Sequence, residues 1–354
     1  MANAHESALH FPWGDRLPAP GTCIELRPGV LWLRMGLPFA LDHINLWLLR
    51  DDDPQRGPGW TIVDCGIADA ATQGHWTTLF DSGVLQGHPV HRVIVTHFHP
   101  DHLGNAHWLC ERWGCRLWMS ATDFHIGRMA SQSTVGMGGD AAAAFFGSHG
   151  LTDPDSLAKI RGRADYFPRM VPQVPSAFRR LMDCERFTIG GHTWQARAGH
   201  GHSPEHLSFH CAELGLLIAG DMVLPRISTN VSVVDVEPEA DPLRLYLASL
   251  DRLADLPEDT LVLPAHGRPF VGLATRRQQL HQHHAERLAE LMAAVQDGAK
   301  TAAELLPVLF KRPLDLHQTT FAMGEAIAHL NHLWLAGRLT RRAGTDGAWR
   351  FGPA

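Results

Sequence analysis

Residues 93–105 read VIVTHFHPDHLGN, an apolar run followed at once by a cluster of polar side chains. Shortly after this run, His97, His99, Asp101 and His102 all lie within the six positions 97–102. The β-branched residues before them are typical of a buried strand. Imidazole and carboxylate groups are common metal ligands. The stretch therefore indicates a metal site on a loop at the end of a strand, and ligands for a second ion have to come from elsewhere in the chain.

The bulk composition is that of a globular protein with a sizeable core. The chain has 354 residues, 45% hydrophobic content and a net charge of −6. This length suggests about two domains, and the negative charge argues against broad binding to nucleic acid. We expect no signal peptide and no membrane span, because neither pattern is found. Six scattered cysteines without a Cys-x-x-Cys pair favour reduced thiols and a cytoplasmic protein.

Strand-like and helix-like patterns alternate in the first part of the chain, which is typical of an α/β layered fold. Short apolar runs predict strands, and amphipathic stretches bounded by turn residues predict helices. The predicted strands are 29–35, 44–50, 60–66, 91–96 and 115–120, and the predicted helices are 69–83 and 105–114.

Residues 121–182 interrupt that alternation and read as a mostly helical insertion. The stretch is rich in Met, Gly, Ala and Phe, and two prolines follow near its end. Two interpretations stay open at this point: a helical pair packed on the sheet, or a lid that builds an apolar substrate pocket.

Strand patterns return after the insertion and then give way to helices. The predicted strands are 186–198, 206–213, 214–221 and 260–267, with a helix at 241–256. From about residue 273 the pattern is helical, Thr301 and Glu304 have capping-box spacing, and 339–351 reads as a hairpin. The order helix, helix, helix, hairpin is winged-helix-like. We therefore expect a catalytic domain at 1–272 and a small C-terminal domain at 273–354.

Three later segments each supply a ligand-type side chain where a predicted strand ends. They carry His202, Asp221 and His266. In layered α/β folds that edge of the sheet is where sites form. Together with the first cluster, they predict a centre for two metal ions.

Five motifs in this order resemble those of the metallo-β-lactamase superfamily. They are VDCG with Asp64, then THFHPDH, GHSPEH, AGD and PAHG, spread over about residues 20–270. The resemblance implies a four-layer αβ/βα sandwich with a metal cleft at one edge.

The resemblance also implies a role for each matching residue. His97, His99 and His202 would bind the first metal, and Asp101, His102 and His266 the second. Asp221 would bridge both ions with its two oxygens. Asp64 would hold a ligand histidine by hydrogen bonding.

The chemistry implied by the resemblance is hydrolysis by a hydroxide that bridges two divalent ions, with Asp101 orienting it. Zinc is the expected metal, with iron and manganese as alternatives, since nitrogen and oxygen ligands accept all three. Two further residues are candidates for substrate contact. His43 is placed to reach the cleft mouth, and Arg226 is a candidate to hold an anionic group. The cluster at His281, His283 and His284 reads as a solvated helix face.

Departures from well-known relatives narrow the substrate. Asp221 stands where the commonest zinc β-lactamases carry a Cys ligand, and AGDMVLPRIS lacks the Tyr of the acyl-homoserine lactonases. We expect a small-molecule ester, thioester or lactone with an apolar acyl part. A phosphodiesterase or RNA nuclease is the first alternative, and a non-catalytic binding protein with a vestigial site is the second.

The charge of the C-terminal segment is weakly informative. From Lys300 onward seven basic residues face four acidic ones, a local +3. A domain that packs on the cleft or forms a homodimer is the main interpretation, and a nucleic-acid surface is the alternative.

Overall fold

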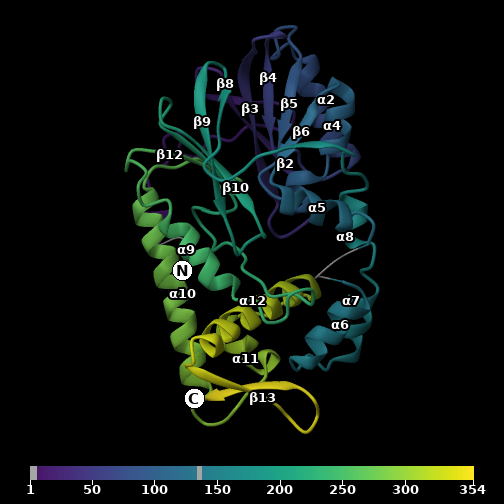
Figure 1. The fold of residues 1–354 in the computed structure, drawn as a ribbon, viewed down its shortest axis with the longest axis vertical. Helices are drawn as coiled ribbons and strands as arrows, with labels where there is room; N and C mark the ends of the chain where they lie inside the picture. Colours follow the sequence, from purple (N-terminus) through teal and green to yellow (C-terminus); the bar gives the residue numbers. More distant parts are fainter. Residues whose placement is uncertain (1–5, 134–137) are drawn as a thin grey trace.

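Two mixed β-sheets form the centre of the fold (Figure 1). The computed structural model describes residues 6–133 and 138–354. The seven strands of the first sheet lie in the order β1-β2-β3-β4-β5-β6-β7. They are β1 (Ile24–Arg27), β2 (Val30–Gly36), β3 (His43–Asp53), β4 (Gly57–Val63), β5 (Val90–Ile94), β6 (Arg116–Met119) and β7 (Phe178–Arg180). Of these, β1 and β7 are strands that the sequence patterns do not predict.

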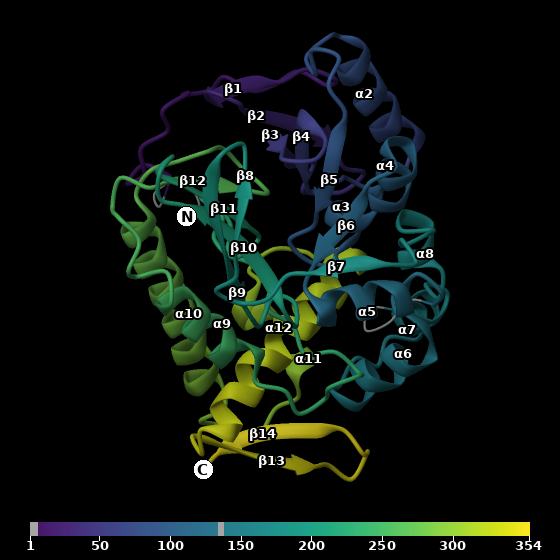
Figure 2. The same ribbon diagram turned by 45° about the horizontal axis from the view of Figure 1, so that its top comes forward.

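The second sheet has five strands in the order β12-β11-β10-β9-β8. They are β8 (Arg186–Ile189), β9 (His192–Gly199), β10 (His206–Cys211), β11 (Leu216–Gly220) and β12 (Leu261–Pro264). The two sheets face each other, with α2 (Ala70–Asp81) and α4 (Ala106–Trp113) outside the first and α9 (Pro242–Asp251) and α10 (Leu273–Ala294) outside the second (Figure 2). The predicted four-layer αβ/βα sandwich is confirmed.

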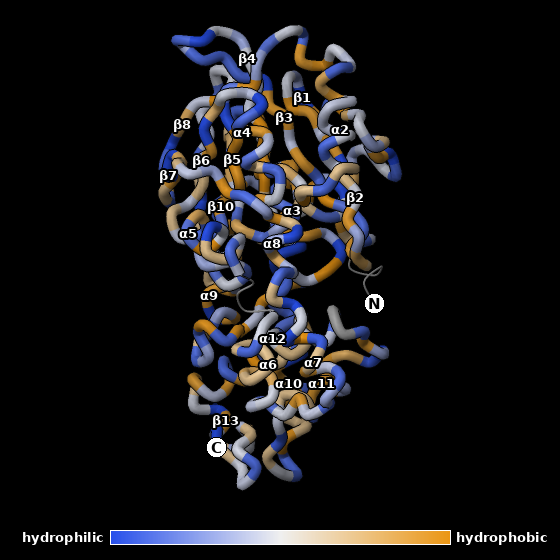
Figure 3. The backbone as a smooth tube through the Cα atoms, turned by 90° about the vertical axis from the view of Figure 1, so that its right-hand side faces the viewer, coloured by the Kyte–Doolittle hydropathy of each residue, from blue (hydrophilic) through white to orange (hydrophobic). Residues whose placement is uncertain are grey.

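The alternation of side chains along the strands explains the layers. In β3, Trp47 and Leu49 point into the core between the sheets, whereas Leu46 and Leu48 point toward the helices of the first sheet. A strand that is apolar on both faces needs cover on both sides. The hydrophobic colour therefore runs along β3 and β5 in the interior (Figure 3). Among the described residues no helix is long and apolar enough to cross a bilayer.

The described part of residues 121–182 is mostly helical, as predicted, and its helices divide between the core of the first sheet and the core that contains the C-terminal helices. The described elements there are α5 (Ala121–Ala130), α6 (Gly139–Ser148), α7 (Pro154–Arg161), α8 (Tyr166–Met170) and β7; residues 134–137 of this stretch lie outside the described residues. Phe145 and Phe146 of α6 are buried in one core with the C-terminal helices. The strand β7 pairs in parallel with β6, so the stretch ends by adding an edge strand to the first sheet.

The C-terminal segment has the predicted order of elements. After α10 come α11 (Ala302–Leu309), α12 (Leu316–Leu335) and the antiparallel pair β13 (Leu339–Ala343) and β14 (Trp349–Pro353). The Thr301–Glu304 capping box is present at the start of α11. These helices share a core with α9 and with Leu217 and Ala219 of β11. The segment is therefore packed against the sandwich rather than attached by a linker.

The interpretation of the three histidines in α10 as a solvated face is wrong for His284. This side chain is fully buried, and its Nδ1 lies 3.0 Å from Nε2 of His329 in α12. His329 is also buried and donates from Nδ1 to the carbonyl of Glu325, at 2.8 Å. The helix α12 therefore covers a face of α10 that looks polar in the sequence.

This buried pair predicts a loss of stability in acid. Burial lowers the pKa of His329 to about 4 and that of His284 to about 2, whereas in the unfolded chain both imidazoles take up a proton near pH 6.5. Lowering the pH from 6.5 toward 4 therefore favours the unfolded chain. Between pH 7 and pH 5, His329 alone should cost about 2 kcal/mol. Urea unfolding at both pH values should give a smaller pH dependence for His329→Gln than for the wild type; an equal dependence would contradict this assignment.

Gly104, just after the histidine loop, is required by a close backbone approach. A Cβ at this position would come within 2.6 Å of the Gly66 carbonyl oxygen and 2.7 Å of the Ala68 nitrogen. We expect Gly104→Ala to lower the free energy of unfolding by about 1–3 kcal/mol, since backbone atoms cannot move aside easily. Gly74→Ala in α2 is the control, because no atom lies within 4 Å of its Cβ. That change should stabilise by about 1 kcal/mol, and thermal unfolding of both variants measures the contrast.

Candidate metal centre

The predicted ligands lie where four strands end at one edge of the sandwich. His97 follows β5, and His99 precedes the short helix α3 (Pro100–Leu103), which carries the next two candidates. His202 follows β9, and Asp221 directly follows β11. His266 lies two residues beyond the end of β12.

Backbone hydrogen bonds join the two sheets at this edge. The Leu207 amide at the start of β10 donates to the Thr96 carbonyl after β5, at 2.8 Å. The Asn45 amide in β3 donates to the Ala265 carbonyl after β12, at 2.7 Å. The strand ends of both sheets are thereby held side by side, which brings ligands far apart in the sequence together.

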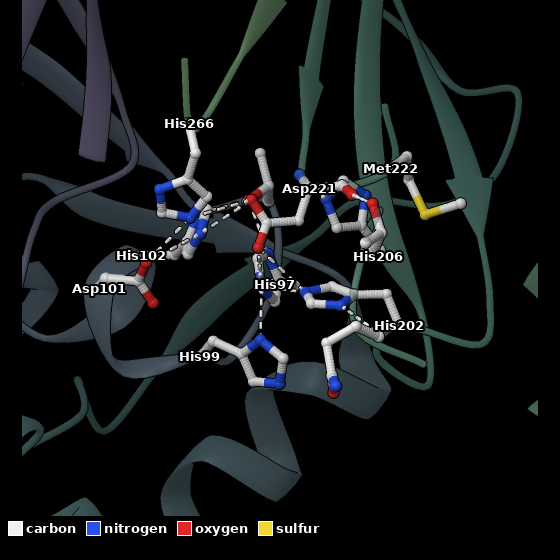
Figure 4. A network of polar contacts seen from close by, with 12 residues as sticks. His97, His99, Asp101, His102, His202, His206, Asp221, Met222 and His266 are labelled. Atoms are coloured by element: carbon white, nitrogen blue, oxygen red, sulfur yellow. Dashed lines mark hydrogen bonds and ion pairs between the residues drawn. The ribbon is translucent and has the colours of Figure 1, made fainter. Parts of the chain in front are cut away.

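Four side chains form the first group that could hold a metal ion: His97, His99, His202 and Asp221. Nε2 of His97 lies 2.9 Å from Nδ1 of His99 and 3.1 Å from Nε2 of His202. Asp221 Oδ2 lies 3.1 Å from Nε2 of His202. The potential donor atoms thus converge on one point (Figure 4).

Three side chains form the second group: Asp101, His102 and His266. Nε2 of His266 lies 3.4 Å from Asp101 Oδ2 and 3.4 Å from Asp221 Oδ1. Nε2 of His102 lies 3.6 Å from Asp221 Oδ1 and 3.7 Å from Asp101 Oδ2. The structure therefore brings together all seven predicted ligands in two adjacent groups.

Asp221 lies between the two groups and turns one oxygen to each. Its Oδ2 faces His202, and its Oδ1 faces His102 and His266. The side chain is 9% exposed, so water does not solvate it freely. This is the arrangement expected of a carboxylate that spans two ions.

Hydrogen bonds on the far side of each ring orient the imidazoles toward the centre. His202 donates from Nδ1 to the carbonyl of Asn230, at 2.7 Å, and His266 donates from Nδ1 to the carbonyl of His43, at 2.7 Å. In the neutral ring this leaves a lone pair on each Nε2. Both lone pairs face carboxylate oxygens, which repels unless a proton or a metal ion lies between them.

Two buried atoms indicate that the site fits a cation. Nε2 of His102 and Oδ1 of Asp221 have no hydrogen-bond partner among the described residues. A buried polar atom without a partner costs free energy. A divalent ion with nitrogen and oxygen ligands would satisfy both atoms at once.

Asp64 lies behind His102, as the sequence predicts. Its Oδ2 lies 2.8 Å from His102 Nδ1, and it also accepts hydrogen bonds from the amide and hydroxyl of Thr96. Asp64 is 1% exposed and has a φ of 62°, a conformation that Asp and Asn tolerate better than most residues. This contact fixes His102 with Nε2 turned toward the centre.

The two groups differ in their electrostatics. Burial strongly lowers the pKa of His97 and lowers that of His99 to about 3, so both rings are neutral. Burial also disfavours the charged form of His102, but Asp64, Asp101 and Asp221 outweigh it and raise its pKa to about 9. Without a metal, the second group therefore holds a proton. Metal binding has to displace it.

Several buried residues that hold these loops were not found from the sequence. Asn45 donates from Nδ2 to the carbonyls of Pro264 and Gly267, on either side of His266. Asp123 accepts from the amides of Phe98 and Glu205, at 3.0 and 2.7 Å, and so ties the loop of His97 to the loop of His202. Each lies far in sequence from its partners, so no local pattern marks it.

The remaining candidates, and His206 at the end of the GHSPEH motif, have these positions. Both ring nitrogens of His43 contact protein: Nδ1 lies 2.6 Å from Asp42 Oδ1, and Nε2 accepts from the Gly267 amide. His43 therefore supports the loop of His266. His206 accepts from the Asp221 amide through Nε2, at 3.1 Å, and is a supporting residue. Arg226 is exposed on the loop after Asp221.

Comparisons with known proteins agree with this geometry. The sequence profile described as "Metallo-beta-lactamase superfamily" matches residues 41–266. The chain belongs to the metallo-β-lactamase superfamily. A second profile, "Metallo-beta-lactamase-like, C-terminal domain", matches residues 288–354. The superfamily hydrolase fold and its candidate metal-binding residues are thus both present in this chain.

Two solved structures are similar to this metallo-β-lactamase superfamily member over nearly their whole length. A β-lactamase domain protein from Burkholderia ambifaria is 52% identical, with a TM-score of 0.94 over 99% of this chain and 100% of that chain. A metallo-β-lactamase family protein from Thermus thermophilus is 30% identical, with a TM-score of 0.76 over 93% of this chain and 100% of that one.

Curated relatives match over shorter stretches. The lactamase-like protein adaB of Aspergillus niger is 32% identical over 33% of this chain and 33% of its own length. An atrochrysone carboxyl ACP thioesterase of Aspergillus fumigatus is 27% identical over 40% of this chain and 46% of its own. A hydroxyacylglutathione hydrolase of Pseudomonas fluorescens is 26% identical over 65% of this chain and 63% of its own. The chain thus spans less than two thirds of each of these relatives.

Proposed function

We propose that this protein is a dinuclear metal-dependent hydrolase that cleaves ester or thioester bonds, with lactones in the same class. The observation that carries the proposal is Asp221, whose two oxygens face two separate groups of ligand-type side chains. A site for one ion needs no carboxylate between two groups.

Seven residues of the chain would hold the two ions. His97, His99 and His202 would hold one ion, Asp101, His102 and His266 the other, and Asp221 both. When bound, such an ion pair supplies a nucleophile from water near neutral pH and polarises the attacked carbonyl. Asp101, which faces the second group, would orient the attacking water. We propose zinc as the metal, with iron and manganese as the alternatives that the same ligands accept.

Two observations support an acyl substrate. Two of the relatives are named for thioester hydrolysis, an acyl carrier protein thioesterase and a hydroxyacylglutathione hydrolase. In this structure the Phe98 ring lies 4.8 Å from the His99 ring and stacks on Phe167 of α8 at 6.0 Å. The half-buried Phe98 would offer an apolar contact to an acyl group beside the first ligand group.

The nuclease alternative receives less support from the C-terminal segment. Arg341 pairs with Glu239 and lies over the rings of Trp334 and Trp349. Arg350 pairs with Asp346 at 2.7 Å. Because these arginines already have partners within the protein, they give less support to a surface that binds the phosphates of a nucleic acid.

The test is hydrolysis of aryl esters, acyl thioesters and lactones of several chain lengths by protein loaded with zinc, iron or manganese. A metal-stripped sample is the control. We expect metal-dependent turnover of at least one ester or thioester and a stoichiometry of about two ions per chain. If protein with two bound ions cleaves phosphodiesters and no acyl compound, the nuclease alternative replaces this proposal. Protein that binds no ion would favour a non-catalytic role.

A further inference from the structure

The loop that follows Asp221 is held by side chains rather than by secondary structure. Thr229 donates its hydroxyl to the Asp221 carbonyl at 2.5 Å, and Tyr246 of α9 donates its hydroxyl to the Met222 carbonyl at 3.1 Å. Both donors are at most 1% exposed. Buried hydroxyls paired with carbonyls in this way restrict the backbone.

Arg276 of α10 fixes the next part of the same loop. This arginine is 4% exposed and donates from Nε to the Leu224 carbonyl at 2.6 Å and from Nη2 to the Ile227 carbonyl at 2.8 Å. The two carbonyls lie on either side of Pro225 and Arg226. The planar guanidinium of Arg276 therefore holds the backbone on both sides of Arg226 by hydrogen bonds.

Pro225 places this clamped segment beside the second ligand group. A Cβ on Gly267 would come within 2.6 Å of Pro225 Cγ, so the two residues are in direct contact. Gly267 directly follows His266, whose Nε2 faces Asp101 and Asp221. Arg226 therefore leaves the backbone next to the loop of a candidate metal ligand.

Arg226 differs from the other arginines around it. Arg34 and Arg276 are bound to backbone carbonyls, and Arg268 pairs with Asp15 and Glu6. The Arg226 side chain is exposed and has no hydrogen bond or ion pair within the described part of the chain. The backbone held by Arg276 thus carries a guanidinium without a protein partner, one residue beyond Pro225, which contacts the loop of His266.

We propose that Arg226 is a specificity-determining residue that binds a carboxylate or phosphate on the substrate close to the bond that is cleaved. The inference rests on the proposed function and narrows it to anionic esters and thioesters. A guanidinium matches the two oxygens of such anions, and fixing the backbone beforehand reduces the entropy lost on binding.

The experiment compares thioesters that differ only in charge. Hexanoyl thioesters of 3-mercaptopropionate and of 3-mercaptopropionamide place the charge, or its neutral match, on the thiol side. The half-thioester of adipate and the corresponding adipamide place it on the acyl side. Arg226→Gln should raise KM for the anionic member of one pair by about tenfold or more and leave the neutral members unchanged. Arg226→Lys should keep part of the preference, and Arg226→Glu should reverse it.

Arg338→Gln is the matched control, because Arg338 is exposed and directly precedes β13, which lies at the opposite end of the molecule from the two large sheets (Figure 1). It should leave every KM unchanged. Equal effects of Arg226→Gln on charged and neutral substrates, or no effect on either, would overturn the inference.

A binding measurement separates this inference from the proposed function. The probes are two thioethers, S-hexyl-3-mercaptopropionate and S-hexyl-3-mercaptopropionamide, together with the half-acid and half-amide thioethers that carry the charge on the other side. None can be hydrolysed, so turnover is not needed. Titration calorimetry on zinc-loaded protein should give tighter binding of an anionic thioether to the wild type than to Arg226→Gln. Equal affinities of both proteins for every probe would overturn the role of Arg226 even if esters are cleaved. A preference without any turnover would support Arg226 and contradict the hydrolase proposal.

Discussion

Replacing Asp221 by Ala should abolish nearly all activity, with a fall of about 1,000-fold or more in kcat/KM, equal to about 4 kcal/mol of transition-state stabilisation. Of the described residues, Asp221 is the one whose two oxygens face both ligand groups, at 3.1 Å from His202 and 3.4 Å from His266. Without this carboxylate two cations at the centre would repel each other with less negative charge between them. We therefore expect the purified variant to hold fewer than two ions per chain.

Metal content by mass spectrometry and turnover on the best substrate measure this prediction together. Asp153→Asn is the matched control, because Asp153 caps α7 by accepting from the Ser156 amide and Asn caps helices equally well. The control should keep both ions and full activity. An Asp221→Ala variant with two tightly held ions and unchanged turnover would contradict the two-metal assignment.

The ligand set was predictable from the sequence because each member sits in a local pattern. His97, Asp221 and His266 each follow an apolar run that forms a strand, and the carboxyl ends of such strands gather at one edge. The continuous apolar run 46–49 within β3 likewise indicates a strand covered on both faces. Period and order along the chain therefore predicted a layered α/β fold with a candidate centre at one sheet edge. The four-layer sandwich and the role of each ligand followed from the five motifs that resemble those of the metallo-β-lactamase superfamily.

Apart from Asp64 and His206, which lie in the motifs, the residues that support the centre were not predictable in this way. Asn45 contacts the loop of His266, more than 200 residues away, and Arg276 clamps the loop after Asp221 from α10. A single Asn in a strand or a single Arg in a helix looks the same whether it is solvated or buried. Their roles depend on how distant elements pack, and this packing has no local signature.

Packing between distant elements also explains why the sequence interpretations of His284 and of residues 121–182 were incomplete. His284 lies in a polar-looking stretch and is buried only because α12 crosses α10. A lid over an apolar substrate pocket was one of the two interpretations of residues 121–182, whereas Phe145 and Phe146 of this stretch join the core with the C-terminal helices. A backbone hydrogen bond joins the insertion to the C-terminal segment: the Ala303 amide donates to the His149 carbonyl at 3.1 Å.

Asp64→Asn should weaken metal binding at the second group by about 10- to 100-fold, the range typical of a residue that orients a metal-binding histidine. Asn keeps the volume of Asp and tolerates the positive φ of 62° at this position. Its side-chain oxygen can still accept from the Thr96 amide, which lies 2.8 Å from Asp64 Oδ1. The Asn amide group would then face Nδ1 of His102 as a donor.

That exchange inverts the tautomer of His102. With a donor opposite Nδ1, the neutral ring carries its proton on Nε2, the atom that faces Asp101 and Asp221. A protonated Nε2 has no lone pair for a metal. The first group should be spared, because His97, His99 and His202 make no contact with Asp64 among the hydrogen bonds of the described residues. Titration against a chelator should therefore find one ion bound as in the wild type and one bound more weakly.

The control for this variant is Asp69→Asn, at the start of α2, where Asp69 accepts from the Thr72 amide. Asn is an equally good cap, so both ions should bind as in the wild type. Unchanged affinity of both ions in Asp64→Asn would show that His102 keeps its orientation without a carboxylate behind it. Loss of both ions would instead mean that the two groups bind metal as one cooperative unit joined through Asp221. The outcome with one weakened ion is the one that follows if Asp64 acts through His102 alone.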